Sequence, residues 1–88
     1  MADQYEWDST KRASNLAKHG IDFNEIARFE WATAAVVPDR RVDYGEARFR
    51  AYGRLDGRAY VVIFTMRGEV YRIVSFRRAN GRERAEHG

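Results

Sequence analysis

The stretch from Ala47 to Arg84, ARFRAYGRLDGRAYVVIFTMRGEVYRIVSFRRANGRER, decides the fold of this chain. Its pattern predicts three successive antiparallel strands and then a short basic helix. The strands are expected at Ala47–Leu55, Ala59–Met66 and Glu69–Arg77. Asp56-Gly57 indicates a tight hairpin turn, because glycine adopts the positive φ that such turns require. The middle run is apolar throughout, which suits a central strand covered on both faces.

Arginine side chains recur along these predicted strands. In the third strand, strict alternation of side chains places Arg72 and Arg77 on opposite faces. A single arginine in an apolar strand is explained by an ion pair with an acid or by snorkelling to solvent. A cluster indicates phosphate binding, because guanidinium groups release counterions from a polyanion and stabilise a charged transition state. The cluster comprises Arg48, Arg50, Arg54, Arg72 and Arg77.

The 88 residues predict one domain, residues 1–88, whose charge is unevenly divided. Residues 1–46 carry six Lys and Arg against nine Asp and Glu, whereas residues 47–88 carry ten against four. Fourteen of the sixteen basic residues are arginine, which favours a nucleic acid or another polyanion as partner. A GC-rich genome also enriches arginine over lysine, but it does not explain why the arginines gather in one half.

Several classes of function find little support in the sequence. The chain has no cysteine and two histidines, so neither a disulfide nor a transition-metal site is expected. No glycine-rich nucleotide-binding loop is present to hold a cofactor. No apolar run is as long as a membrane span, and the first residues are polar and acidic, unlike a signal peptide. The expectation is a soluble cytoplasmic protein that uses no cofactor, no metal and no membrane.

The N-terminal half predicts two helices and two short strands. The strands are expected at Tyr5–Trp7 and Ala34–Val37. Asp8 or Ser9 caps a helix that ends at His19, and Gly20 follows as a left-handed C-cap. Asp22 begins a second helix with an apolar face, because an acid three residues later completes a capping box.

The C-terminal end predicts one more helix, in which Asn80 is the N-cap and Glu83 the third helical residue. Residues 39–46 are charged and are expected to form a loop or an irregular edge. The predicted fold class is therefore α+β, with two N-terminal helices and a short C-terminal helix packed on a small antiparallel sheet.

His19 is the histidine best placed for chemistry, because His87 lies near the chain end and is expected to fray. On spacing alone His19 is typical of a surface or C-capping residue. As a functional group it would donate or accept a proton near neutral pH. The helix end raises its pKa, whereas the neighbouring cation Lys18 lowers it. Both interpretations remain open at this point.

An ordered set of residues along nearly the whole chain resembles the BrnT family, the toxins of type II BrnT–BrnA toxin–antitoxin systems. The N-terminal part of the set comprises Trp7-Asp8, Lys11, Asn15, Lys18-His19-Gly20 and Phe23. The C-terminal part comprises Gly45-Glu46, Arg48-Phe49, Gly53, Arg72-Ile73-Val74-Ser75, Arg77-Arg78-Ala79 and Arg82-Glu83. Two features depart from the family pattern: Phe76, where relatives usually have a small residue, and the tail Glu86-His87-Gly88, where many have a tyrosine.

The resemblance implies a RelE-like ribonuclease fold and a bacterial cytoplasmic toxin that inhibits translation by cleaving RNA. It also implies a cognate BrnA-like antitoxin as protein partner. Such an antitoxin binds DNA as a ribbon-helix-helix dimer, so operator DNA would be contacted only indirectly, through the antitoxin.

The residues and the resemblance together lead to the hypothesis of a metal-independent endoribonuclease. The 2′-hydroxyl of the RNA attacks the adjacent phosphate, which leaves a 2′,3′-cyclic phosphate and a 5′-hydroxyl. His19 is the expected general acid or base, with Glu46 or Tyr71 as substitutes. The phosphate is expected to be held by Arg72, Arg77 and Arg78. Further RNA contacts are expected from Lys18, Arg48, Arg50, Arg54 and Tyr71. The alternatives are a non-catalytic RNA-binding or antitoxin-docking module and a purely structural subunit.

Overall fold

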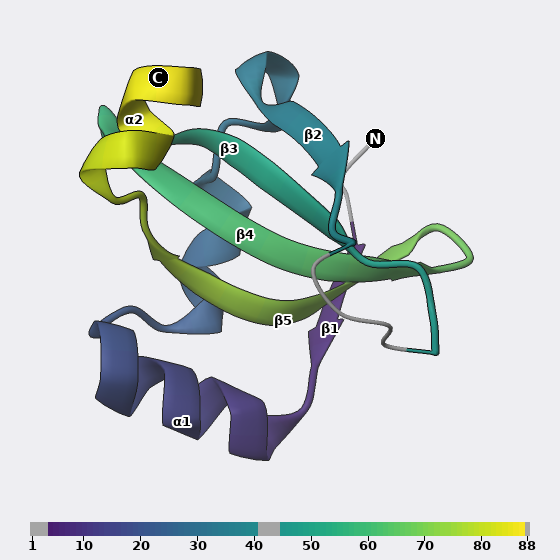
Figure 1. Ribbon diagram of the computed structural model, residues 1–88. Helices are drawn as coiled ribbons and strands as arrows, with labels where there is room; N and C mark the ends of the chain where they lie inside the picture. The colour runs from purple at the N-terminus through teal and green to yellow at the C-terminus, as the bar shows by residue number, and fades with distance from the viewer. Residues whose placement is uncertain (1–3, 41–44, 88) are drawn as a thin grey trace.

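The computed structural model describes residues 4–40 and 45–87. They form a five-stranded sheet in the order β1-β5-β4-β3-β2, with one α-helix beside β5 and a short helix at the C-terminal end (Figure 1). The strands are β1 Gln4–Trp7, β2 Ala35–Pro38, β3 Phe49–Leu55, β4 Arg58–Arg67 and β5 Val70–Arg78. The three strands of the central stretch therefore lie close to their predicted bounds.

The sheet is mixed, so the prediction of an antiparallel sheet is wrong. β2, β3, β4 and β5 pair antiparallel with their neighbours, but β1 pairs parallel to β5, with Gln4 opposite Val70 and Trp7 opposite Ile73. No local sequence pattern indicates the direction of β1, because that direction depends on pairing with β5, a strand far along the chain. After β1 the chain continues in the same direction into α1 (Ser9–His19), which lies alongside the rest of β5 (Figure 1).

The prediction of a second N-terminal α-helix is also wrong. In its place are two 3₁₀-helices, η1 Phe23–Arg28 and η2 Trp31–Thr33. Phe23, Ile26 and Phe29 are all buried and lie three residues apart, which is the period of a 3₁₀-helix. Asp22 does cap η1 by accepting from the backbone N–H of Asn24 at 3.0 Å. The apolar face is thus real, but its period is three rather than 3.6.

Both other predicted helices form with their expected caps. The Asp8 carboxylate accepts hydrogen bonds from the backbone N–H groups of Thr10 and Lys11 at 2.7 and 3.2 Å, and Gly20 closes α1 with φ of 72°. At the other end of the chain, α2 spans Gly81–His87. Asn80 and Glu83 exchange backbone-to-side-chain bonds of 2.8 and 2.9 Å, as a capping box requires.

The two faces of the sheet bury different amounts of apolar surface. One face packs on η1 and η2 and holds the main core, which includes Phe23, Ile26, Ile73 and Phe76. The opposite face holds a small cluster of Tyr52, Val61 and Ala79, and α2 lies over it (Figure 1). Adjacent valines of β4, at positions 61 and 62, are both 0% exposed, which confirms the prediction of a central strand covered on both faces.

Asn15 attaches α1 to the exposed edge of β5. Its side-chain amide donates to the carbonyl of Phe76 at 2.8 Å and accepts from the backbone N–H of the same residue at 3.1 Å. The amide also donates to the carbonyl of Ile21 at 3.2 Å. β1 pairs with β5 only as far as Ile73, so the Asn15 side chain continues the pairing of that edge where β1 has ended. This contact fixes the position of α1 along β5.

Candidate nucleic-acid interface

A β-bulge places Arg72 and Arg77 on the same face of the sheet. Along the β4–β5 ladder, Arg72 lies opposite Thr65 and Arg77 opposite Val61, with a register shift between Ile63 and Phe64. The shift leaves Val74 as one extra residue in β5, and an extra residue reverses the alternation of side chains beyond it. The prediction that the two arginines lie on opposite faces is therefore wrong. Sequence alternation alone carried no signal for the bulge.

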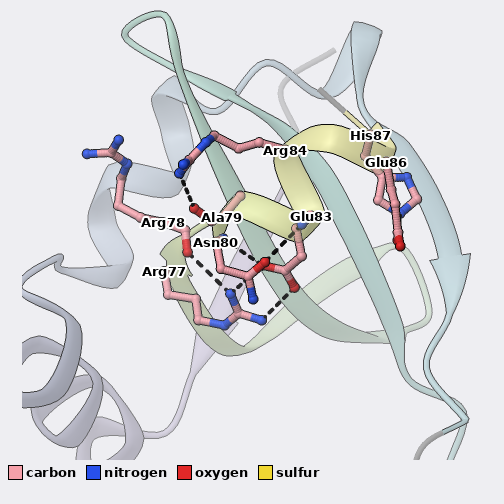
Figure 2. Close-up of polar contacts among 8 residues, drawn as sticks. All are labelled: Arg77, Arg78, Ala79, Asn80, Glu83, Arg84, Glu86 and His87. Carbon is pink, nitrogen blue, oxygen red and sulfur yellow. Dashed lines mark hydrogen bonds and ion pairs between the residues drawn. The ribbon is translucent and has the colours of Figure 1, made fainter.

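Other predicted arginines lie on this face too, which we call the arginine face. In the β3–β4 ladder, Arg50 lies opposite Ile63 and Arg54 opposite Ala59, next to the small cluster under α2. The guanidinium carbon of Arg50 lies 5.7 Å from the centroid of the Tyr52 ring. Arg78 is different: it lies opposite Tyr60, with its guanidinium carbon 5.7 Å from that ring, and it points away from Arg77 in Figure 2.

Most of these arginines contact a carboxylate. Arg72 donates to Glu6 at 2.5 Å, and Arg50 lies 3.9 Å from Asp39, whose side chain is 0% exposed. Arg48 lies 4.0 Å from Glu46, and Arg54 donates to the carbonyl of Gly57 at 3.3 Å. The ion-pair explanation for strand arginines thus applies to several of them.

Arg77 makes the best-formed ion pair of this face, and its partner is Glu83 of α2 (Figure 2). Its two terminal nitrogens donate to the two carboxylate oxygens at 2.7 and 2.9 Å. This double hydrogen bond, helped by the backbone N–H of Asn80, lowers the pKa of Glu83 to about 2. The sequence indicated Glu83 only as a helix cap. Its contact with Arg77 required the tertiary structure.

The low pKa of Glu83 predicts a loss of stability in acid. A carboxyl whose pKa is lower in the folded state stabilises that state above its ordinary pKa, and this contribution disappears as the pH falls towards the folded-state pKa. We expect Glu83→Gln to cost about 2 kcal/mol of unfolding free energy at neutral pH and progressively less below about pH 4.5. Glutamine can still cap Asn80, so the substitution isolates the charge.

Urea denaturation between neutral pH and pH 2.5 would measure this difference, with Glu86→Gln as the matched control. Glu86 is on the same helix and its side chain is 54% exposed in a pair with Arg82, so we expect a change within about 0.5 kcal/mol there. If the difference in unfolding free energy between the wild type and Glu83→Gln stayed the same at every pH, that result would contradict the pairing.

A groove runs between α1 and β5, which we call the α1–β5 groove. It has a volume of about 390 Å³ and is lined by Thr10, Lys11, Ser14, Asn15, Lys18, His19, Val74 and Ser75. At one end, the Asp8 carboxylate is close enough to feel the charges of Arg72 and Lys11. At the other end, His19 is close enough to feel those of Arg77 and Lys18. On β5 the groove is lined by Val74 and Ser75, which lie between the two arginines in sequence.

The lysines of the groove differ from the arginines beside it. Lys11 and Lys18 are the only lysines of the chain, and within residues 4–40 and 45–87 neither forms an ion pair with a carboxylate. Lys11, Ser14 and Lys18 follow the i, i+3, i+7 spacing of one helix face. Lys18 was predicted to contact RNA, whereas Lys11 and Ser14 were not, although the helical spacing of the three residues is present in the sequence.

His19 occupies the C-terminal end of the groove and its pKa is lowered. Burial is the main cause, and the positive charges of Arg77 and Lys18 add to it. The sequence predicted two opposing influences on this pKa, from the helix end and from a neighbouring cation. The cations, together with burial, outweigh the helix end. A lowered pKa keeps the imidazole neutral near pH 7, so that one ring nitrogen can accept a proton.

Two predicted residues lie away from the groove. Tyr71 is on the core face, where its ring stacks on Trp31 with centroids 4.6 Å apart, and on Tyr5 at 5.6 Å. Glu46, the other substitute for His19, lies 3.8 Å from Arg67. His87, in α2, stacks its ring on that of Tyr52 in β3, with ring centroids 3.8 Å apart. Of the histidines, only His19 faces the groove.

No helix in the described part of the chain is long and apolar enough to cross a bilayer. Among the same residues, no group of three or more histidine, aspartate or glutamate side chains is arranged to hold a metal ion.

Comparisons with known proteins agree on one family. Residues 7–83 match the family model described as "Ribonuclease toxin, BrnT, of type II toxin-antitoxin system". The 1.1 Å crystal structure of the Brucella abortus ribonuclease toxin BrnT superposes with a TM-score of 0.72. It shares 32% sequence identity with this chain, over 89% of this chain and 97% of that one. No protein with curated annotation matches significantly.

Proposed function

The chain belongs to the BrnT family of ribonuclease toxins of type II toxin–antitoxin systems, and from this premise we propose that it is a metal-independent endoribonuclease with His19 and Arg77 at its reaction centre. The observation that carries the proposal is the position of His19, which lines an open groove along β5. The positive charge of Arg77, which lies two residues beyond Ser75 of that lining, reaches His19 and helps to lower its pKa.

RNA supplies the nucleophile, so the protein has three tasks. It aligns a 2′-hydroxyl with the adjacent phosphorus, removes its proton and stabilises the negative charge of the phosphorane. Neutral His19 takes the proton from the 2′-oxygen as the new O2′–P bond forms. The P–O5′ bond then breaks and the leaving 5′-oxygen takes a proton from water. The products are a 2′,3′-cyclic phosphate and a 5′-hydroxyl.

The geometry divides the three predicted catalytic arginines. Arg77 is close to His19 and belongs at the reacting phosphate, where Glu83 holds its guanidinium in a fixed plane. Arg72 lies at the far end of the groove and belongs at a neighbouring phosphate. Arg78 is on the opposite face, so the proposal leaves it out of the reaction centre.

We extend the proposal to the biological setting that the family implies. The chain would act in the bacterial cytoplasm and inhibit translation by cleaving RNA. A cognate BrnA-like antitoxin would neutralise it, and operator DNA would be contacted only through that antitoxin. Support for this extension comes from the family membership.

A second candidate function is a module that binds RNA or an acidic antitoxin without cleavage. The ion pairs Arg72–Glu6 and Arg77–Glu83 favour it, because these guanidinium groups already hold carboxylates of the kind an acidic partner would present.

Incubation of the purified protein with end-labelled RNA in EDTA separates the two functions. We expect cleavage at an undiminished rate, with cyclic phosphate at the new 3′ ends, because no step of the proposed reaction uses a metal. Substituting 2′-deoxynucleotides at the cleaved positions should abolish the reaction, since the nucleophile is then missing. Intact RNA of shifted electrophoretic mobility would instead support the binding module.

A further inference from the structure

The α1–β5 groove has the length of a short single strand of nucleic acid. α1 has 11 residues, which at 1.5 Å per residue gives a wall of about 16 Å. On β5 its wall is Val74 and Ser75, and Arg72 and Arg77 flank these two residues in the strand. Within the wall, Lys11 and Lys18 are seven positions apart, or about 10 Å along the helix axis. The groove thus offers two ammonium groups on one line, separated by a distance that spans more than one nucleotide.

The electrostatic balance of the groove is positive. Arg72 and Arg77 each form an ion pair, with Glu6 and Glu83, whereas the two lysines form no ion pair within the described residues. The Asp8 carboxylate feels the charge of Lys11, but its Oδ1 atom accepts hydrogen bonds from the backbone N–H groups of Thr10 and Lys11 and is engaged as the helix cap. Uncompensated ammonium groups are the part of this surface that can release counterions from a polyanion.

The remaining lining of the groove suits a sugar–phosphate backbone better than bases. Thr10, Ser14 and Ser75 bring hydroxyl groups, which donate to phosphate oxygens and exchange hydrogen bonds with ribose. Among the described lining residues, the imidazole of His19 is the only ring, so the groove offers no platform on which successive bases could stack. Affinity in this groove would therefore come from the backbone and would be similar for every base.

We propose that the α1–β5 groove is the track of one unpaired RNA strand, whose phosphates bind Lys11 and Lys18. The inference rests on the proposed function and adds the substrate class, single-stranded RNA, and the side chains that hold it. A duplex fits poorly. Duplex-binding domains contact two minor grooves over about 16 base pairs, whereas this domain is 31 Å in its longest dimension and its lysines lie on a single line.

Fluorescence anisotropy with a short RNA that carries 2′-O-methyl groups throughout tests the track without interference from cleavage. For single strands, each lost phosphate contact lowers the slope of log affinity against log salt by about 0.7. Lys11→Gln and Lys18→Gln should each lower the slope by about this amount, and the double variant by the sum. The matched control is Arg82→Gln, on α2 with an 87% exposed side chain, which should leave the slope unchanged.

Two competitors complete the experiment. Oligonucleotides of uridine and of adenosine should bind within about threefold of each other, and a duplex of the same length at least about tenfold more weakly. Several results would overturn the track: a wild-type slope in the double variant, equal binding of the duplex, displacement by polyglutamate at equal charge, or no binding by the wild type at low salt. A strand that binds as expected but is never cleaved when unmodified would refute the nuclease instead. Cleavage with unchanged slopes would refute only the track.

Discussion

His19→Ala is expected to lower the rate of RNA cleavage by about 10²–10⁴-fold, because it removes the group that takes the proton from the 2′-hydroxyl. In the wild-type protein, burial and the charges of Arg77 and Lys18 hold the pKa of His19 below its ordinary value. The imidazole is therefore neutral at physiological pH, and the wild-type rate should stay level through neutrality and fall only in acid. The alanine variant should lose this acid limb of the pH–rate profile.

The measurement is initial cleavage rate against pH on a labelled RNA, together with binding of the 2′-O-methyl strand to show that the groove is intact. His87→Ala is the matched control: it removes the other histidine of the chain, which stacks on Tyr52 under α2. We expect its cleavage rate to stay within about threefold of the wild type, as for a residue that contacts neither substrate nor groove. If His19→Ala cleaved at the wild-type rate with the same acid limb, His19 would have no catalytic role.

Arg77→Ala is expected to lower cleavage by about 10²–10³-fold, the usual cost of losing one group that stabilises transition-state charge. Expression of this variant should no longer arrest growth. The variant also removes a charge that depresses the pKa of His19, so the acid limb of its residual activity should move to higher pH. The shift of that limb tests the electrostatic coupling between Arg77 and His19, whereas the loss of rate tests the role of Arg77 at the phosphate.

Folding has to be controlled in this case, because Arg77→Ala leaves the carboxylate of Glu83 without its strongest partner. The double variant Arg77→Ala/Glu83→Gln removes both charges and should regain stability but not activity. Arg78→Ala is the matched control, since it removes an arginine from the next position in β5 but on the opposite face. It should cleave as the wild type does. A well-folded Arg77→Ala protein that still arrests growth would exclude Arg77 from the reaction centre.

These predictions depend on the arginine face of the sheet, which the sequence predicted only in part. The arginine-rich stretch indicated a polyanion-binding surface, and the structure does gather Arg50, Arg54, Arg72 and Arg77 on one face. It also shows carboxylates against most of them, whereas Lys11 and Lys18 of the α1–β5 groove form no ion pair with a carboxylate among residues 4–40 and 45–87. Ion pairs such as Arg72–Glu6 join residues that are 66 positions apart, and no sequence pattern links them.

The sequence by itself determined the features that depend on near neighbours along the chain. The cap at Asp8 and the left-handed Gly20 follow from backbone groups within one helical turn. The hairpin at Asp56-Gly57, where φ is 51° and 77°, follows from the residues that tolerate positive φ. The BrnT pattern likewise depends on residue identities in order. The three-residue spacing of Phe23, Ile26 and Phe29 was also present in the sequence, but it was interpreted as an α-helical face.

Only the tertiary structure decided which of these elements meet. The parallel direction of β1 and the bulge at Val74 arise from pairing between strands distant in sequence, and the bulge alone determines that Arg72 and Arg77 share a face. The contact of α1 with β5 through Asn15 then brings His19 within reach of the charge of Arg77. Backbone pairing across the sheet and the burial of one apolar face select these arrangements. Both are properties of the whole packed chain and not of any short segment.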